Sequence, residues 1–388
     1  MKNSIINGDY IERVKKLNGV YIHIPFCKSK CPYCDFYSYR CTQEARKEYV
    51  DAIIDEINSL SRASPYLNSD GFCADTLYIG GGTPSLLCGE DIERIVSSAR
   101  ERFNMPEGSE ITIECNPASD IESLIPYFLR CGINRVSLGM QSAIDEERKI
   151  LGRSANRGRI SEVIALLKKN GITNISLDVM LGIPNQTPES LTETLQFAVD
   201  CDVTHISAYI LKIEDGTFFD THRDRYTFPD EDEVCSLYEL CVDFLENAGF
   251  PQYEISNFAK PSFHSRHNTK YWILEDYLGI GAAAHSLVNG KRFYYPDDSD
   301  SFINECSPIY DGEGNTAEEY IMLRLRLRDG IDLSALSELY GTEYLNTIKE
   351  KAPLLAKQGL VSYDEKTLSL TKKGFLLSNS VIAEFLSE

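Results

Sequence analysis

The sequence predicts an α/β fold: a partial, TIM-like (β/α)6 barrel followed by a mostly helical, winged-helix-like C-terminal domain. Two observations carry this prediction. In the first half of the chain, short β-branched runs alternate with longer amphipathic stretches, and toward the C-terminus the pattern changes to helices and a hairpin. Strand–helix repetition at this spacing implies a parallel sheet with right-handed crossovers, so an open doubly wound sheet is the alternative fold.

The expected barrel has six strands, each a short run rich in Val, Ile, Leu or Tyr. These runs cover residues 20–24, 76–79, 110–115, 135–140, 175–180 and 205–211. Helical patterns lie between them, several opened by Ser, Thr or Asp and closed near Gly, over residues 43–60, 91–102, 121–131, 159–170 and 188–200. We expect the carboxyl ends of the six strands to surround one mouth, where functional side chains gather.

The second half of the chain is less regular. An acidic and aromatic connection covers residues 214–233, and a helix that ends at residue 247 follows it. An unusual segment then covers residues 253–287. Three further helices are expected over residues 317–328, 333–340 and 344–358. A hairpin with strands at 360–363 and 367–370 follows, and then a final helix. This order is typical of a winged helix, but its few basic residues are offset by acidic ones, which favours a packing or partner role over DNA binding.

We therefore expect three parts: an N-terminal segment over 1–18, a barrel with its extension over 19–292, and a C-terminal domain over 293–388. The 39 Lys and Arg against 59 Asp and Glu give a net charge of −20, which argues against nucleic-acid binding and against residence on a membrane surface. No run is long and apolar enough for a membrane span and no secretory signal is evident, so a cytoplasmic location is expected. The twelve Cys then indicate reduced thiols or metal ligands.

Three of these cysteines form the strongest chemical signal. Cys27, Cys31 and Cys34 lie in HIPFCKSKCPYC, a C-x3-C-x2-C spacing directly after the first expected strand. A structural zinc ion would require a fourth ligand from Cys41, His23 or a distant residue. An iron–sulfur cluster with one iron free of protein ligands explains the triplet without that fourth ligand.

Other polar residues follow the later strands. A glycine run, Gly80 to Gly82, with Thr83 behind it, closes the second strand and lets a ligand approach the backbone, although such runs are usually only turns. The third, fourth and fifth strands contribute further polar side chains near their ends: Glu114, Gln141, Arg153 and Asp178. A carboxylate inside an apolar strand needs a partner, and for Asp178 either Arg153 or a ligand hydroxyl would serve.

The cysteine loop resembles that of the radical S-adenosylmethionine (SAM) enzymes. The motifs YIHIPFCxxxCxYCxF, GGGTPS, ECNP, GMQS, LGR and LDVMLGIP are similar to those of the oxygen-independent coproporphyrinogen III oxidase group. The resemblance implies a [4Fe-4S] cluster on the three cysteines and a bound SAM molecule. The residues that it implies as SAM contacts are Tyr21, Tyr33, Gly81, Gly82, Thr83, Glu114, Gln141, Arg153, Asp178 and Ala208.

Three departures point to a branch of this group, the coproporphyrinogen oxidase-like heme chaperones of the HemW type. Phe36 stands where the oxidases carry an additional Cys, and only 26 residues precede Cys27. The segment HNTKYW resembles the HNxxYW hallmark of the chaperones, which implies heme contacts by His267, Asn268, Tyr271 and Trp272. The alternative is that Tyr271 and Trp272 pack the barrel bottom and His267 makes one buried hydrogen bond. His264, His285 or a Cys could also ligate heme iron instead of His267.

The resemblance implies a carrier that binds the cluster and SAM and passes heme to apo-hemoproteins, those of the respiratory chain among them. A flavodoxin or ferredoxin would serve as its reductant, and a membrane would be met only through the heme acceptors. Coproporphyrinogen oxidase activity is not expected. Two alternatives stay open: the oxidase itself, and a simple iron–sulfur electron carrier, which would bind no SAM.

Overall fold

A computed structural model describes residues 17–67 and 72–386. The expected N-terminal segment, 1–18, lies outside the described residues except for its last two positions. Within the described part of the chain, no helix combines the length and the hydrophobicity needed to cross a membrane.

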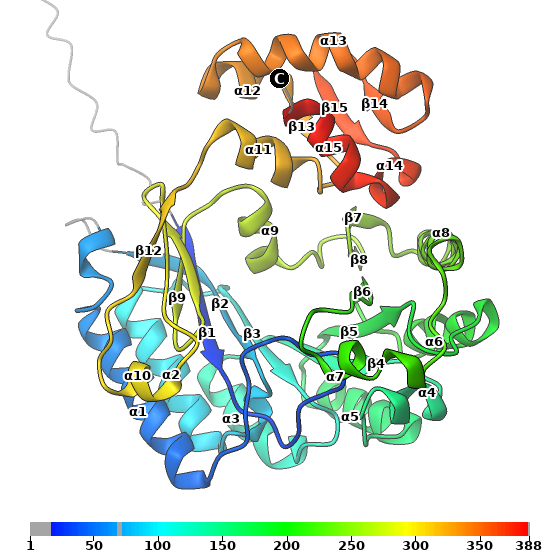
Figure 1. Ribbon diagram of the computed structural model, residues 1–388. Helices are drawn as coiled ribbons and strands as arrows, with labels where there is room; N and C mark the ends of the chain where they lie inside the picture. Colours follow the sequence, from blue (N-terminus) through cyan, green and yellow to red (C-terminus); the bar gives the residue numbers. More distant parts are fainter. Residues whose placement is uncertain (1–16, 68–71, 387–388) are drawn as a thin grey trace, which may run out of the picture.

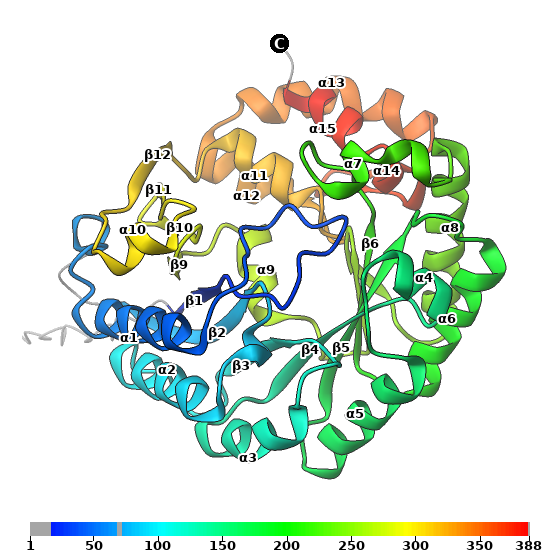
Figure 2. The same ribbon diagram turned by 60° about the horizontal axis from the view of Figure 1, so that its bottom comes forward.

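The barrel is built from six parallel strands that pair in chain order, at the positions that the sequence predicts. They are β1 (Leu17–Ile24), β2 (Cys73–Gly81), β3 (Glu110–Cys115), β4 (Arg135–Gln141), β5 (Asn174–Leu181) and β6 (His205–Ile210). The helices form an outer layer around the curved sheet (Figure 2): α1 (Gln43–Ser59), α2 (Gly89–Arg102), α3 (Ile121–Cys131), α4 (Asp145–Ile150), α5 (Arg157–Lys169), α6 (Pro188–Asp200) and α8 (Glu231–Asn247).

The two faces of this sheet differ in polarity because successive side chains of a strand point to opposite faces. The face toward the helices carries the apolar core, with Ile22, Leu77, Ile113, Leu138, Val179 and Ile206 among its members. The opposite face carries polar residues that bond to one another across the strands. Ser137 donates to Asp178 at 3.1 Å, and Ser176 bonds to His205 at 2.7 Å. An ordinary TIM barrel fills its interior with branched apolar side chains, so this polar interior indicates a different use.

The barrel sheet does not close on itself. Its strand order is β12-β11-β10-β9-β1-β2-β3-β4-β5-β6-β8-β7, and the strands beyond the six barrel strands make it a mixed sheet. The segment that the sequence left unassigned, 253–287, folds into short strands and a helix. Its elements and their neighbours are β7 (Gln252–Glu254), β8 (Asn257–Ala259), α9 (Arg266–Trp272), β9 (Tyr277–Ile280), β10 (His285–Val288), β11 (Lys291–Tyr294), α10 (Ser299–Ile303) and β12 (Ile309–Glu313).

The C-terminal domain lies over the open side of the barrel (Figure 1). It contains α11 (Ala317–Arg324), β13 (Ile331–Asp332), α12 (Leu333–Tyr340), α13 (Glu343–Lys357), β14 (Val361–Tyr363), β15 (Thr367–Leu370), α14 (Lys372–Leu376) and α15 (Ser378–Leu386). The hairpin and the helices agree with the expectation, whereas the short strand β13, which joins the hairpin in a three-stranded sheet, was not predicted. The expected division at residue 292 falls inside β11, and the barrel sheet continues to Glu313.

Short helical turns complete the connections. They are η1 (Ser64–Tyr66), η2 (Pro84–Leu86), α7 (Phe218–Thr221) and η3 (Arg223–Arg225). The last two lie in the acidic and aromatic connection after β6. There the backbone N–H of Phe219 donates to the carbonyl of Pro32 at 2.9 Å, so this connection holds the middle of the cysteine loop in place.

Candidate functional site

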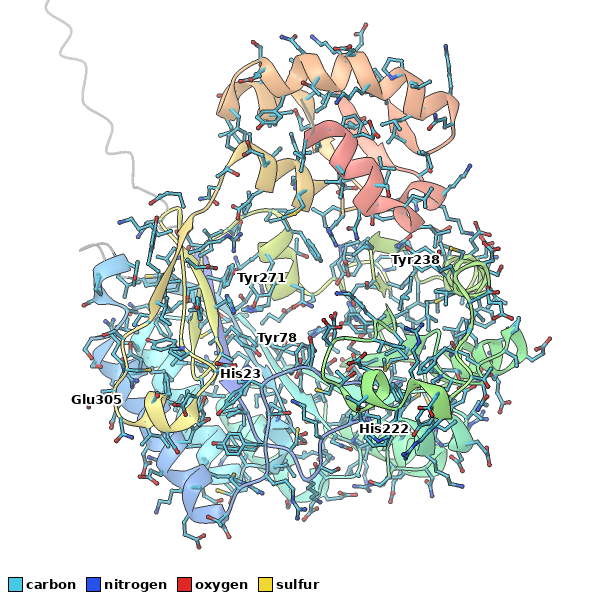
Figure 3. The ribbon with its side chains drawn as sticks, viewed as in Figure 1. His23, Tyr78, His222, Tyr238, Tyr271 and Glu305 are labelled. Atoms are coloured by element: carbon cyan, nitrogen blue, oxygen red, sulfur yellow. The ribbon has the colours of Figure 1, made fainter. Side chains whose placement is uncertain are left out.

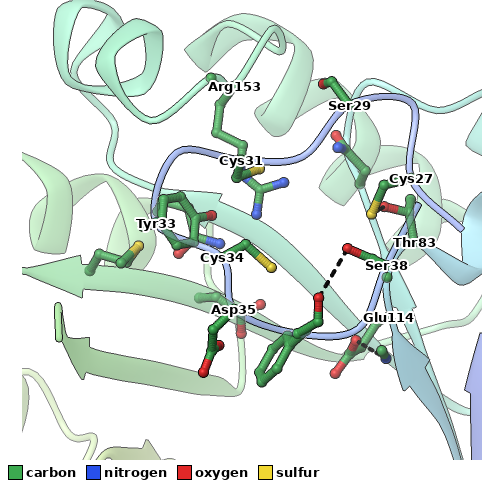
Figure 4. A pocket seen from close by; sticks show the side chains of 18 of the residues that line it. Cys27, Ser29, Cys31, Tyr33, Cys34, Asp35, Ser38, Thr83, Glu114 and Arg153 are labelled. Atoms are coloured by element: carbon green, nitrogen blue, oxygen red, sulfur yellow. Dashed lines mark hydrogen bonds between the residues drawn. The ribbon is translucent and has the colours of Figure 1, made fainter. Parts of the chain in front are cut away.

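The cysteine loop runs over the mouth of the barrel, and its two ends pair with each other directly after β1. The N–H of Cys27 donates to the carbonyl of Tyr39 at 2.9 Å, and the N–H of Tyr39 donates to Pro25 at 2.8 Å. Within the loop, the N–H of Cys34 donates to the carbonyl of Cys31 at 3.1 Å, which forms a tight turn. Figure 4 shows the three labelled cysteines on this one loop, at the edge of the cavity that it encloses. The loop therefore presents three thiols to one space.

The donor set fits an iron–sulfur cluster better than a zinc ion. Within the described ranges, no three Cys, His, Asp or Glu side chains converge closely enough to hold a single metal ion. A structural zinc ion needs four ligands around one point, whereas each cysteine of a cluster binds a different iron and the thiols are spread apart. Cys41 does not line the cavity. Both nitrogens of His23 are bonded, to the hydroxyl of Tyr21 at 3.0 Å and the carbonyl of Tyr37 at 3.2 Å.

The loop encloses one side of a cavity of about 530 Å³, which we call the mouth cavity. Most of the residues expected to hold the cluster and SAM line it together, although they come from six segments of the chain. They are Cys27, Cys31, Tyr33, Cys34, Gly81, Gly82, Thr83, Glu114, Gln141, Arg153 and Asp178. The volume suits a ligand of nucleoside size, which falls within the usual range for small-molecule sites.

Two partly buried carboxyl groups give this cavity its electrostatic character. Burial, and then the nearby carboxylate of Asp178, raise the pKa of Glu114 to about 7. Burial also raises the pKa of Asp178 to about 6. Glu114 accepts hydrogen bonds from the hydroxyl of Tyr78 at 2.8 Å and from the N–H of Gly81 at 3.1 Å. A ligand with positive charge or hydroxyl donors would stabilise the ionised form of both groups.

Arg153 does not form an ion pair with Asp178 among the described residues, although both line the mouth cavity. The direct partner of Asp178 is the hydroxyl of Ser137. The guanidinium of Arg153 lies over Gly139, where an added Cβ would meet Nη2 at 2.9 Å, and its buried Nε has no hydrogen-bond partner in the described chain. A donor left unpaired at the wall of a cavity is suited to an acceptor on a ligand.

Two expected SAM contacts lie outside the mouth cavity. Ala208 is 1% exposed and belongs to the apolar core, and Tyr21 lines a different cavity. Tyr209 and Ile210 line the mouth cavity instead, and sequence reasoning missed both. Strict alternation along β6 places Tyr209 on the same face as His205 and Ser207, opposite to Ala208, so the period of the strand was a signal for Tyr209.

The backbone at the mouth is also shaped for close approach. An added Cβ at Gly82 would lie 2.8 Å from the carbonyl oxygen of Phe26, so only glycine fits between β2 and the start of the cysteine loop. Gln141 adopts a left-handed conformation, with φ of 71°, directly after a bulge in β4. Non-glycine residues are uncommon in this region, and such strain is concentrated at functional sites.

A second cavity, of about 430 Å³, opens at the unclosed side of the barrel, and we call it the lateral cavity. Three residues of the HNTKYW segment line it: Asn268, Tyr271 and Trp272. Glu114 and Tyr209 line both cavities, so the two spaces share a wall. The other lining residues are Tyr21, Tyr78, Glu254, Ile255, Ser256, Asn257 and Arg326.

His267 lies behind the lateral cavity rather than in it. Its side chain is 0% exposed, and both ring nitrogens are bonded, Nδ1 to the hydroxyl of Thr76 at 2.9 Å and Nε2 to the hydroxyl of Tyr271 at 2.7 Å. Burial lowers the pKa of His267 to about 3, so its ring is neutral. The other expected heme ligands, His264 and His285, stack on Tyr253 and Tyr294 and line neither cavity.

A curved, unclosed β/α barrel with a three-cysteine loop over its mouth defines the class of radical SAM proteins. Residues 21–198 match the family described as the radical SAM superfamily, and residues 315–377 match the HemN C-terminal domain. The solved structure of coproporphyrinogen III oxidase (HemN) from Escherichia coli shares this fold: its TM-score is 0.80 at 24% identity, with 95% of this chain and 90% of that chain covered.

Curated relatives narrow the class. The chain is 30% identical to the heme chaperone HemW of Lactococcus lactis, with 96% of this chain and 98% of the relative covered. It is 32% identical to HemW of Bacillus subtilis, with 96% and 100% covered, and 36% identical to HemW of Escherichia coli, with 70% of each covered. The chain belongs to the HemW family of heme chaperones.

Proposed function

We propose that this chain holds a [4Fe-4S] cluster on Cys27, Cys31 and Cys34, binds SAM in the mouth cavity, and transfers heme to apo-hemoproteins. The mouth cavity is the observation that carries the proposal, because three thiols and two partly buried carboxyl groups face one space. When bound, the cluster would supply one iron free of protein ligands, to which the amino and carboxylate groups of SAM can bind. Relatives named heme chaperone HemW support heme as the cargo.

Each part of SAM has a suitable partner in the mouth cavity. Gly82 and Thr83 offer backbone and hydroxyl groups to the methionine end. Glu114 and Asp178 suit ribose hydroxyls or the positive charges of SAM. The unpaired Nε of Arg153 offers a donor. Tyr33 lines the wall within the cysteine loop.

The lateral cavity is the place that we propose for heme. Five of its twelve described lining residues are aromatic, and flat aromatic side chains suit a porphyrin face. Among the described residues that line it, Arg326 is the only cation and can pair with a propionate.

We propose apo-hemoproteins of the respiratory chain as acceptors and a flavodoxin or ferredoxin as reductant. None of the twelve cysteines forms a disulfide, and free thiols are typical of the cytoplasm, where we place this activity.

The pH dependence of SAM binding tests whether the carboxyl groups of Glu114 and Asp178 stabilise bound SAM. Below its pKa each group is neutral, and above it each is a carboxylate that attracts the sulfonium charge of SAM. We therefore expect SAM affinity to rise between about pH 5 and about pH 7, by roughly tenfold for each group whose pKa falls by about one unit on binding. Calorimetric titration at each pH measures it. Glu114→Gln should flatten the upper part of this rise, and an identical profile in that variant would contradict the role of Glu114.

Heme binding without porphyrinogen turnover separates the chaperone from the oxidase. We expect the holo-protein to bind heme but to form no protoporphyrinogen IX from coproporphyrinogen III with SAM and a reductant. Phe36, in the position of the oxidases' additional Cys, is 62% exposed at the mouth cavity and offers no thiol there. Turnover above that of a cluster-free control would assign the chain to the oxidases instead.

Trp272 provides a second test of the heme site. Trp272→Ala should weaken heme binding by ~1–2 kcal/mol through the loss of an aromatic contact, while the iron content stays unchanged. Tyr310→Ala is the matched control, because Tyr310 is an exposed aromatic residue on β12 that lines neither cavity. Heme titration followed by absorbance measures both variants. Equal affinities would remove Trp272 from the proposed site.

A further inference from the structure

Two tyrosine–histidine pairs lie at the lateral cavity, and they differ in the group on the far side of the imidazole. Tyr271 bonds to Nε2 of His267 at 2.7 Å, and Nδ1 of that ring bonds to the hydroxyl of Thr76 at 2.9 Å. Tyr21 bonds to Nδ1 of His23 at 3.0 Å, and Nε2 of that ring contacts a backbone carbonyl at 3.2 Å. Both tyrosines line the cavity.

The group bonded to the second ring nitrogen of each histidine determines whether the first nitrogen can donate a hydrogen bond to the tyrosine or only accept one. A carbonyl only accepts, so Nε2 of His23 carries the hydrogen and Nδ1 accepts from the O–H of Tyr21. That tyrosine is held as a neutral phenol. The hydroxyl of Thr76 can either donate or accept, so His267 can either accept from a phenol or donate to a phenolate. Only the pair of Tyr271 and His267 is suited to both states of the tyrosine.

The other side chains at the cavity are less suited to bind iron. None of the six histidines, all of which lie in the described ranges, lines either cavity. Tyr78 donates to the carboxylate of Glu114, which holds it as a phenol. Tyr209 has no hydrogen bond to a histidine within the described chain, and the carboxylate of Asp178 lies nearby. Phenolate oxygen is an established axial ligand of ferric heme.

We propose that Tyr271 is the axial ligand of ferric heme in the lateral cavity and that His267 is the positioning residue that stabilises its phenolate. This inference rests on the proposed heme function. On binding, the O–H bond of Tyr271 breaks, its proton leaves to the solvent, and the oxygen donates an electron pair to iron(III), so no electron is transferred. The ring of His267 stays neutral: it donates from Nε2 to the phenolate and accepts at Nδ1 from Thr76.

The surroundings support this arrangement. Figure 3 shows the labelled Tyr271 and Tyr78 in the space between α9 and the strands of the barrel. The ring of His267 stacks on Tyr78 with centroids 5.3 Å apart, and it meets Tyr271 edge to face at 5.1 Å. The carboxylate of Glu110 accepts from the backbone N–H groups of Arg266 and His267, both at 3.0 Å, which fixes the start of α9. The tyrosine is therefore held on a rigid element, as a metal ligand requires.

Spectra of the ferric heme complex test the inference in the full-length holo-protein. The wild type should show the phenolate-to-iron charge-transfer band and the iron–phenolate Raman bands of a tyrosinate complex. Tyr271→Phe should lose these signals and bind hemin about tenfold more weakly or worse. Tyr253→Phe is the matched control, since it removes the hydroxyl of a tyrosine that bonds to His205 at 2.8 Å and lines neither cavity, and it should keep these signals. Thermal melting checks that the variants are folded.

A second pair of variants tests the role of His267 through Thr76. Thr76→Val keeps the shape but removes the hydroxyl, so it should shift the charge-transfer band and weaken hemin binding severalfold, whereas Thr76→Ser should restore both. An imidazole-type spectrum in the wild type, or signals that survive in Tyr271→Phe, would overturn the inference while heme binding itself stands. Absence of hemin binding by the wild type would overturn the proposed function as well.

Discussion

Replacement of any one of Cys27, Cys31 and Cys34 by alanine is expected to abolish stable cluster binding. Among the described residues, these thiols are the only cysteines that line the mouth cavity. A cluster with one iron free of protein ligands has no anchor to spare, because each thiolate holds a different iron. After anaerobic reconstitution, the iron and sulfide content and the charge-transfer absorption of each variant should fall to the level of the apo-protein.

Cys41→Ala is the control for this experiment. Cys41 follows the same loop, is partly buried and does not line the cavity, so its loss should leave the iron content unchanged. A triple variant of Cys27, Cys31 and Cys34 that still holds four irons would end the assignment of the cluster to this loop. If Cys41→Ala alone loses its iron, Cys41 would be identified as a fourth ligand, which would favour a different metal centre.

Gly82→Ala is expected to damage the cluster and SAM binding together. A Cβ at this position would lie 2.8 Å from the carbonyl oxygen and 2.9 Å from the nitrogen of Phe26, the residue before Cys27. Backbone cannot move aside as a flexible side chain can, so the start of the cysteine loop must shift. We expect a lower iron content and no change in the electron paramagnetic resonance signal of the residual reduced cluster when SAM is added.

Glu114→Gln separates the two functions of the mouth. It keeps the shape of the side chain and lies away from the thiols, so the iron content should be normal while SAM affinity falls by roughly tenfold.

Gly158→Ala is the control for the Gly82→Ala variant, because a Cβ there meets only Asn156, at 3.5 Å. A Gly82→Ala protein with full iron content and a normal response to SAM would show that the close packing against Phe26 is not needed.

Local patterns predicted much of this molecule. The six barrel strands were found from their β-branched runs, because such runs have the right length and composition for buried strands. The cysteine spacing and the polar residues at the strand ends predicted most of the mouth cavity, because parallel strands bring their carboxyl ends to one edge. Gly82 was predicted only as a contact of SAM, and its packing against the start of the cysteine loop was not predicted. Its contact with Phe26, 56 positions away in the chain, could not be read from the motif.

Such local sequence patterns could not predict the lateral cavity. Its wall combines Tyr21 from the first strand, Trp272 from α9 and Arg326, which follows α11. Their meeting depends on how the sheet stops short of closure and on where the C-terminal domain docks. Neither feature has a local signature. The pairing of Tyr271 with His267 was visible as a four-residue spacing on a helix, but the third member, Thr76, comes from another strand.

The wall that the two cavities share makes their occupants thermodynamically dependent on each other. Glu114 lines both spaces, so its carboxylate interacts electrostatically with an occupant of either one. Whatever factor a cofactor in one space applies to affinity in the other, the cargo must apply in return, because coupling free energy is reciprocal. Loading and release of the cargo can then be biased by the cofactor without any large movement of the barrel.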